Sequence, residues 1–573
     1  MCGFVGILGS NLNIKDKISD AIESIKHRGS IDSKPNFYFS DSYSCAFYRL
    51  SIIDLHSRSN QPYKKDGFNF ILCFNGEIYN YYELKTFLTT KGYVFSGMSD
   101  TELVYYAFDF WGDKCFANFR GMFAIAIFDI KQNNLYLCRD HLGIKPLYYS
   151  NSFKNVYFAS EIKALRTFVG FSANEDNIFE FLTYGNNIDE NTIFKDIFEV
   201  NPGEMIKIDT DLKSKKIKYF NLCDTFYNEQ DIDYDEIKFL LEESVRLHCN
   251  CDVKYASQLS GGLDSSFITA LAKKQNPNLQ SFSIRFENKV IDESKFQNLL
   301  IKDLKLQSYF LVYDDFFNLE KMKEAVYFED FPLHHPNILA SNELNKMALD
   351  KGNKMLLSGD GADELFCGYN WHLFNGNNLD LQDELNFLSY APINKLKMAL
   401  NLKQKPLNKD LINELNIIPK EQIMVYLGQK IYIQKWLRRQ DRSGMQNSLE
   451  IRVPFVDVEL FKKINTYSLK AKTRNYTNNK FILKNIAKFY IKDDIIFQRK
   501  IGFPMPIKEY FKDKKANIFW DLLRSQRAKQ RGIYNIAYIN NLIENHQKNI
   551  EDNSRILWVL LNLELWFIVF IDE

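Results

Sequence analysis

Several features that would assign this chain to a class at once are missing from it. Its nine cysteines form no Cys-x-x-Cys pair, and no His/Cys cluster has zinc-site spacing, so we expect neither a structural metal nor a disulfide framework. The formal net charge is only +1, which gives no reason to expect binding to nucleic acid or to an anionic membrane. No leader segment precedes Cys2, and a cytoplasmic protein is therefore expected.

Long apolar runs are scarce as well. The best candidate, residues 556–571 (ILWVLLNLELWFIVFI), contains Glu564 and has about 16 residues, fewer than the ~20 that a membrane-spanning helix needs. We predict a buried helix of the protein core there. With 573 residues, 46% of them apolar, the chain is too long for one core, and two to four domains are expected.

The first part of the chain, residues 2–208, has the pattern of short strands between turns. Apolar runs of about four to eight residues, such as CGFVGIL and MFAIAIFDI, are rich in β-branched and aromatic residues, which is typical of strands. Helical patterns lie near residues 15–26, 81–91 and 100–111. Many strands with few helices predict stacked sheets that are covered by helices.

Beyond residue 208 the pattern changes twice. Residues 209–236 are polar and mixed in charge, and we interpret them as a linker that leads into a second domain, residues 237–573. Strands and helices then alternate, with helices near 265–274 and 292–304, which predicts a parallel, doubly wound α/β sheet. From about residue 380 onward helices dominate.

Cys2 is the most informative residue near the amino end. Removal of Met1 would leave it with both a thiol and a free α-amino group. Because an α-amine titrates near ~8, it can serve as the base that produces the attacking thiolate. Attack on an amide also needs donors for the oxyanion that forms, and the Asn75 side chain and the Gly76 N–H are candidates.

A bound glutamine would need its two α-groups held as well. Arg49 could hold the α-carboxylate with a bidentate fork, and Glu77 and Asp100 could hold the α-ammonium. Each residue has a plainer interpretation: Arg49 as a surface charge, and Asp100 as the N-cap of the helix TELVYYAF. The combination with Cys2 favours a glutamine site.

The loop 260–266 (SGGLDSS) follows a strand and opens a helix. Its two glycines allow close backbone approach, and the N–H groups and serine hydroxyls at the helix start suit an anion. Asp264 would repel a phosphate unless Mg²⁺ bridges the two. No Walker motif occurs in the chain. A tight turn capped by serine is the alternative.

A second loop, 358–364 (SGDGADE), follows the strand KMLL in the same half of the chain. The loops at the carboxyl ends of parallel strands meet at one edge of the sheet, where ligands bind. The carboxylates of Asp360, Asp363 and Glu364 could hold Mg²⁺, accept a hydrogen bond from a ribose hydroxyl, or act as a base. A solvated acidic turn is the alternative.

The order of these motifs resembles that of the glutamine-hydrolysing asparagine synthetases, over nearly the whole chain. In that family an N-terminal-nucleophile (class II) glutaminase domain precedes an ATP-pyrophosphatase synthetase domain. The matching segments are Cys2-Gly3 with Gly6-Ile7, His27-Arg28-Gly29, Arg49-Leu50-Ser51-Ile52, Asn75-Gly76-Glu77-Ile78-Tyr79-Asn80, Arg120-Gly121-Met122-Phe123-Ala124, residues 139–149 (RDHLGIKPLYY), 260–266, 358–369 (SGDGADELFCGY), Asp441-Arg442-Ser443-Gly444-Met445, Glu450-Ile451-Arg452-Val453-Pro454-Phe455, Lys480-Phe481-Ile482-Leu483 and Arg499-Lys500-Ile501-Gly502-Phe503.

The resemblance implies an αββα sandwich followed by a doubly wound α/β domain with a helical C-terminal part, and an enzyme with two sites. Cys2 would attack the side-chain amide of glutamine, and ammonia would cross through an internal channel to the second site. There ATP would adenylate an acceptor carboxylate, releasing pyrophosphate, and ammonia would displace AMP to form an amide. Relatives are often dimers, so a homodimer is one expectation.

The resemblance also implies roles for individual residues. The residues that would hold glutamine are Arg49, Leu50, Ile52, Asn75, Gly76, Glu77 and Asp100. Those that would hold ATP and pyrophosphate are Leu259, Ser260, Gly261, Gly262, Asp264, Ser265, Ser266, Ile284, Ser358, Gly359 and Lys480. Those implied in catalysis are Cys2, Asn75, Gly76, Asp360 and Lys480. The Mg²⁺ ligands would be Asp264 and Asp363.

Three departures from the family pattern concern chemistry. The loop after His27-Arg28-Gly29 continues Ser30-Ile31-Asp32 where the family commonly has Pro-Asp. Asp360 stands where established asparagine synthetases usually have Glu, and a carboxylate roughly 1.5 Å shorter would harm a positioned base. His334-His335 occupy the region where an arginine is expected.

These departures leave the acceptor open. Aspartate is the leading prediction, but the Asp360 form resembles relatives that amidate sugar uronic acids during surface-polysaccharide assembly. A third hypothesis, a nucleotide-sensing or partner-binding protein without catalysis, is disfavoured because Cys2, Asn75, Asp264 and Lys480 are all present.

Overall fold

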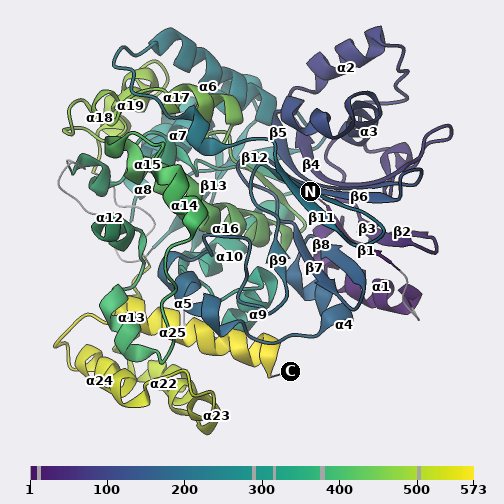
Figure 1. Ribbon diagram of the computed structural model, residues 1–573. Coiled ribbons are helices and arrows are strands. Elements are labelled where there is room, and N and C mark those ends of the chain that lie inside the picture. The colour runs from purple at the N-terminus through teal and green to yellow at the C-terminus, as the bar shows by residue number, and fades with distance from the viewer. Residues whose placement is uncertain are drawn as a thin grey trace.

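The first half of the molecule contains two antiparallel sheets (Figure 1). The computed structural model describes residues 2–9, 14–286, 292–313, 318–374, 381–499 and 505–572. Of the predicted family segment 499–503, residues 500–503 lie outside the described residues. The first sheet has the strand order β2 (Asn36–Phe39), β3 (Tyr43–Tyr48), β1 (Gly3–Leu8), β8 (Asn155–Ala159), β7 (Tyr148–Ser152) and β9 (Phe198–Glu199). The second has the order β11 (Ser214–Lys218), β10 (Glu204–Ile208), β6 (Asn134–Arg139), β5 (Gly121–Asp129) and β4 (Phe70–Ile78).

The two sheets pack face to face, and helices cover both outer faces. Successive side chains of a strand point to opposite faces, so Val5 and Ile7 of β1 pack under α1 (Ile14–Glu23), while Phe4 and Leu8 pack between the sheets. Helices α2 (Tyr81–Thr90) and α3 (Asp100–Trp111) cover the second sheet. The predicted αββα sandwich is confirmed, and so are the three predicted helices.

The second half contains a five-stranded sheet in which every pair is parallel. Its order is β14 (Gln307–Val312), β13 (Gln280–Arg285), β12 (Tyr255–Gln258), β15 (Met355–Leu357) and β16 (Glu450–Arg452). The chain runs outward from β12 to β14 and then returns to the other side of β12. The strand order therefore reverses between β12 and β15, which is where such sheets bind ligands.

Helices pack on both faces of this parallel sheet. Helix α7 (Leu263–Gln275) shares a core with Met355 and Leu357 of β15, whereas α10 (Asn337–Asp350) packs with Leu356 on the opposite face. The predicted doubly wound sheet is confirmed. The remaining helices are α4 (Arg166–Val169), α5 (Glu175–Tyr184), α6 (Tyr234–His248), α8 (Ser294–Leu304), α9 (Leu319–Glu329), α11 (Ala362–Leu365), α12 (Leu381–Leu388), α13 (Ile393–Ala399), α14 (Lys409–Leu415), α15 (Ile423–Leu427), α16 (Ile433–Met445), α17 (Val458–Asn465), α18 (Leu469–Thr473), α19 (Phe481–Ala487), α20 (Asp493–Ile496), α21 (Ile507–Tyr510), α22 (Asn517–Arg524), α23 (Gln526–Gln530), α24 (Ile536–Gln547) and α25 (Ser554–Trp566).

The segment 209–236, predicted as a linker, contains a strand. Within it, β11 pairs with β10 and extends the second sheet of the sandwich, and α6 begins at Tyr234. We therefore propose that the boundary between the two halves lies after Lys218 rather than at residue 208.

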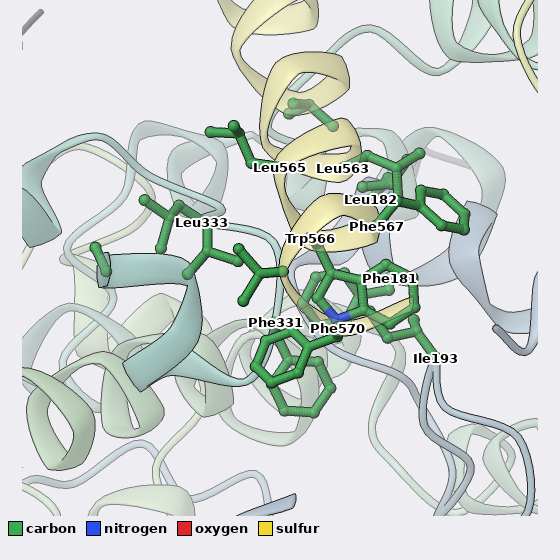
Figure 2. Packing of buried hydrophobic residues seen from close by; sticks show 14 of the residues in the cluster. Phe181, Leu182, Ile193, Phe331, Leu333, Leu563, Leu565, Trp566, Phe567 and Phe570 are labelled. Carbon is green, nitrogen blue, oxygen red and sulfur yellow. The ribbon is translucent and has the colours of Figure 1, made fainter. Parts of the chain in front are cut away.

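The apolar C-terminal segment is a core helix. Ser554–Ile571 is the one helix among the described residues that is long and apolar enough to cross a membrane, but 83% of it is buried inside the fold. Figure 2 shows Trp566 and Phe570 packed among side chains that include Phe181 and Phe331. The indole of Trp566 donates to the backbone oxygen of Asp330 at 3.1 Å. The predicted buried helix is confirmed.

Replacement of Trp566 by alanine is expected to destabilise the protein strongly. The side chain is fully buried and lies 5.0 Å from the Phe194 ring, so its loss leaves a large cavity and should cost about 3–5 kcal/mol. Urea unfolding followed by circular dichroism measures this. Phe489→Ala is the control, because Phe489 is 69% exposed and its loss should cost less than about 0.5 kcal/mol. Equal losses for the two variants would contradict the assignment of 554–571 to the core.

Candidate active sites

The predicted nucleophile lies where the two sheets of the sandwich meet. Cys2 precedes β1 and packs among the side chains between the sheets. Its N–H donates to Asn75 Oδ1 at 2.8 Å, and its Sγ lies 3.9 Å from the backbone oxygen of Leu50. Burial raises the pKa of the Cys2 thiol, so the thiol needs a base to ionise near neutral pH.

Asn75 holds Cys2 with one end of its amide and leaves the other end free. Its Nδ2 is buried and has no hydrogen-bond partner among the described residues. A buried donor without a partner is costly, and one beside a thiol is what a developing oxyanion requires. The next residue, Gly76, lies against β5: a Cβ there would be 2.0 Å from the Met122 backbone oxygen. Only glycine fits.

Two buried carboxyl groups lie close to this site. Burial raises the pKa of Asp100 to about 6, and it raises the pKa of Glu77 although Arg452 opposes the shift. Asp100 accepts a hydrogen bond from the Ile78 N–H at 2.7 Å. It is not the N-cap of α3, because Ser99 caps that helix through the Thr101 N–H. The capping interpretation of Asp100 is therefore wrong.

Arg49 is half-buried and braces a loop. Its guanidinium donates to the backbone oxygens of His56 at 2.8 Å and Ile53 at 3.3 Å. Its positive charge is close enough to lower the pKa of the Cys2 thiol against the larger effect of burial. Leu50 and Ile52, on the same segment, are buried against Met445 of α16.

A cavity of about 430 Å³ opens where the order of the parallel strands reverses. The predicted nucleotide residues that line it are Leu259, Ser260, Gly262, Asp264, Ser265, Ile284, Ser358, Gly359 and Lys480, together with Asp360 and Asp363. Gly261 and Ser266 are not among the lining residues. The side chain of Ser266 is buried in α7 instead.

No described side chain caps the helix that follows the loop 260–266. Gly262 is the N-cap residue of that helix, α7. The Ser260 N–H donates to Ser265 Oγ at 3.1 Å, which closes the turn. The alternative of a serine-capped turn is therefore wrong. The uncapped first turn is suited to an anion.

Lys480 joins the two loops at the carboxyl edge of the sheet. Its Nζ lies 2.6 Å from Asp264 and 2.7 Å from Asp363. Burial alone would lower the pKa of Lys480, but the two carboxylates outweigh burial and raise it. The ammonium is therefore charged at neutral pH.

The same two carboxylates fit the predicted Mg²⁺. The described residues contain no group of three or more His, Cys, Asp or Glu side chains that could hold a metal alone. Mg²⁺ is usually bound by one or two carboxylates together with phosphate oxygens and water. Asp264 and Asp363, which face one another across Lys480, offer this donor set when a pyrophosphate is present.

Asp360 is held by residues that the sequence did not single out. Its Oδ2 accepts from Arg439 at 2.9 Å and from the Gln440 side chain, and its carboxylate also contacts Ser358 Oγ. Arg439 and Gln440 lie on α16 and line the cavity. Their signal in the sequence was their position directly before the Asp441-Arg442 motif.

The histidines at 334–335 pack against neighbouring aromatic rings. Both side chains are partly buried, and the desolvation of the rings lowers the pKa of His335 to about 3 and that of His334 well below its ordinary value. His335 packs against Tyr390 and Trp436. Because both histidines stay neutral near pH 7, they do not supply the charge of the arginine that they replace.

Comparison with known proteins assigns a family model to each half of the chain. Residues 236–568 match the family model for asparagine synthase, and residues 1–220 match the model for the glutamine amidotransferase domain. The chain belongs to the asparagine synthetase family. It is a glutamine-dependent ligase, and the family uses ATP as a substrate.

Three relatives illustrate the family relationship. Asparagine synthetase [glutamine-hydrolyzing] 1 of Bacillus subtilis is 29% identical, over all of this chain and 97% of its own length. A putative asparagine synthetase of Mycobacterium tuberculosis is 27% identical over all of this chain and 98% of its own length. A putative asparagine synthetase of Methanocaldococcus jannaschii is 31% identical over 66% of this chain and 78% of its own length.

Proposed function

We propose that this chain hydrolyses glutamine at Cys2 and uses the ammonia to amidate an ATP-activated aspartate, with asparagine as the product. One observation carries the proposal for the first step: Asn75 Oδ1 accepts a hydrogen bond from the Cys2 nitrogen, and the buried Nδ2 of the same amide has no partner among the described residues. This is the arrangement of a nucleophile with a preformed oxyanion donor.

In the first half-reaction the α-amine of Cys2, freed by loss of Met1, takes the thiol proton. The thiolate attacks the glutamine amide carbon, and the carbonyl electron pair moves to an oxygen held by Asn75 Nδ2 and the Gly76 N–H. Ammonia leaves with a proton from the α-amine, and water hydrolyses the thioester to release glutamate. Arg49 would hold the substrate α-carboxylate, and Glu77 with Asp100 the α-ammonium.

In the second half-reaction ATP occupies the 430 Å³ cavity. Leu259 and Ile284 would contact adenine, Ser358 and Gly359 the ribose, and the loop 260–266 with Lys480 the pyrophosphate. The acceptor carboxylate attacks the α-phosphorus and pyrophosphate leaves; ammonia then displaces AMP. Bound at Asp264 and Asp363, Mg²⁺ would neutralise phosphate charge. Ammonia would travel inside the protein, because in water at neutral pH it is mostly protonated and no longer a nucleophile.

A sugar uronic acid is the second candidate acceptor. The observation that favours it is Asp360, which stands where glutamate is usual in asparagine synthetases. Its shorter side chain accepts hydrogen bonds from Arg439 and Gln440 of α16. His334 and His335, whose pKa values are lowered by desolvation, are neutral near pH 7 and add no charge near this end of the site.

ATP–pyrophosphate exchange with each candidate acid tests the acceptor. Only a true acceptor forms an acyl-adenylate and returns labelled pyrophosphate to ATP. We expect the exchange rate with aspartate to be at least about tenfold higher than with glucuronate or galacturonate, because binding of the wrong acid leaves polar groups in the site unpaired. Exchange with a uronate alone would reject aspartate, and exchange with no acid tested would reject both acceptors.

Glutamine binding is expected to weaken in acid. Burial raises the pKa of Asp100 to about 6, so the carboxyl is charged above this pH and neutral below it. A neutral Asp100 cannot pair with the α-ammonium, and the KM for glutamine should therefore rise about tenfold per pH unit below 6. Glutaminase assays from pH 5 to 8 measure this. Asp100→Asn should give a high KM that does not change with pH; a flat profile for the unaltered enzyme would contradict the role of Asp100.

A further inference from the structure

A buried ionic contact connects the nucleophile to the other half of the molecule. Arg28 follows α1 in a short 3-10 helix, Lys26–Arg28, and is fully buried. Its Nε donates to the backbone oxygen of Cys2 at 2.9 Å. Its two terminal nitrogens form a bidentate pair with Asp441 of α16, at 2.8 and 3.2 Å. One guanidinium therefore holds the nucleophile residue and a carboxylate from the second half at the same time.

The packing around Arg28 leaves this contact little freedom. A Cβ on Gly3 would lie 2.9 Å from the Arg28 Cβ, so the backbone beside Cys2 touches the arginine side chain. Arg28 also pairs with Glu161 at 2.7 Å. Asp441 is 3% exposed; burial alone would raise the pKa of its carboxyl, but Arg28 and Lys145 hold it below its usual range. The Arg28–Asp441 pair is charged, buried and bidentate, and this makes its geometry specific.

Helix α16 reaches both reaction sites with neighbouring residues. Arg439 and Gln440 hold Asp360 in the synthetase cavity, and Asp441, the next residue, holds Arg28. Consecutive residues of a helix are about 100° apart around its axis, so Arg439 and Asp441, two residues apart, point to nearly opposite sides of one rigid element. At the end of the helix, Met445 packs on Leu50, whose backbone oxygen faces the Cys2 thiol.

We propose that Asp441 is a positioning residue for the glutaminase reaction: through Arg28 it fixes the backbone of Cys2, and α16 thereby ties the geometry of the nucleophile to the acceptor end of the synthetase site. The proposal rests on the proposed role of Cys2. It adds that full glutaminase activity needs a residue from the second half that does not touch glutamine.

Asp441→Asn tests this, with Asp330→Asn as the matched control. Asp330 is equally buried and belongs to the same interface, but it pairs with Lys163 and Arg442 rather than with Arg28. A nucleophile displaced by a fraction of an ångström attacks poorly, so kcat for glutamine hydrolysis should fall about 10–100-fold in Asp441→Asn, with KM within about threefold. Alkylation of Cys2 by iodoacetamide should slow in parallel. Asp330→Asn should change both rates less than about threefold.

Two further measurements keep the outcomes separate. Ammonia-dependent amide synthesis should be retained by both variants, which reports that each protein is folded. Equal loss of glutaminase in the two variants, or a rise in KM with unchanged kcat, would overturn the positioning role. The proposed function is tested independently: if Cys2→Ala still released glutamate, that function would fail whatever Asp441→Asn does.

Discussion

Cys2→Ala is expected to reduce glutamate release from glutamine by about a thousandfold or more, because no other group can form the thioester. Ammonia-dependent amide synthesis should continue, since the synthetase cavity lies in the other half of the chain. Alanine at position 2 still permits removal of Met1, so the amino end is unchanged apart from the thiol. Both rates can be measured in one preparation, by glutamate release and by AMP formation.

Cys45→Ala is the matched control for this variant. Cys45 is a buried cysteine of β3 and packs in the same core between the sheets. It should retain glutaminase activity, although the loss of a buried sulfur lowers stability slightly. Glutamate release by Cys2→Ala near the unaltered rate would remove Cys2 as the nucleophile. Loss of the ammonia-dependent reaction as well would show that the variant had damaged the whole fold.

The second large effect is expected at Lys480. Lys480→Gln removes the ammonium that lies between Asp264 and Asp363, so a pyrophosphate would face two carboxylates without it. We expect ATP–pyrophosphate exchange to fall about a hundredfold or more, as for loss of one preorganised charge from a reaction site. Exchange in the presence of the accepted acid is the measurement.

The controls for Lys480→Gln separate chemistry from folding. Lys488 is two turns further along the chain and exposed, so Lys488→Gln should keep exchange within about twofold. Glutamate release by Lys480→Gln should remain, which reports that the protein is folded. Unchanged exchange in Lys480→Gln would exclude Lys480 from pyrophosphate binding.

Much of the architecture was predictable because its signals are local. Alternating or continuous apolar runs indicated the strands of the sandwich, and the regular succession of strands and helices indicated the parallel sheet. That sheet in turn predicted that the loops 260–266 and 358–364 lie together, and they line one cavity. These predictions needed only the positions of the strand ends and the polar residues that follow them.

The differences between the sequence-based expectations and the structure also have local causes. Strand β11 has the sequence SKKIK and is mostly exposed at the edge of its sheet. Lysines on an edge strand protect it from aggregation, but they also give the segment the polar composition that is typical of a linker. Ser99 and Asp100 are both good N-cap residues, and the sequence could not decide which one caps α3. The resemblance assigned Ser266 to the nucleotide loop; its side chain is buried in the first turn of α7, and its role in ATP binding stays a prediction.

By itself the sequence determined the family, the order of the two halves and most side chains that carry chemistry, because each of these depends on residues close together along the chain. Only the tertiary structure decided what surrounds those side chains. Three features depend on burial and on residues far apart in the chain: the Asn75 Nδ2 without a partner among the described residues, the neutral histidines at 334–335, and the contact of Arg28 with Asp441. Burial sets the cost of an unpaired polar group and the charge of a titratable one, and no local pattern records it.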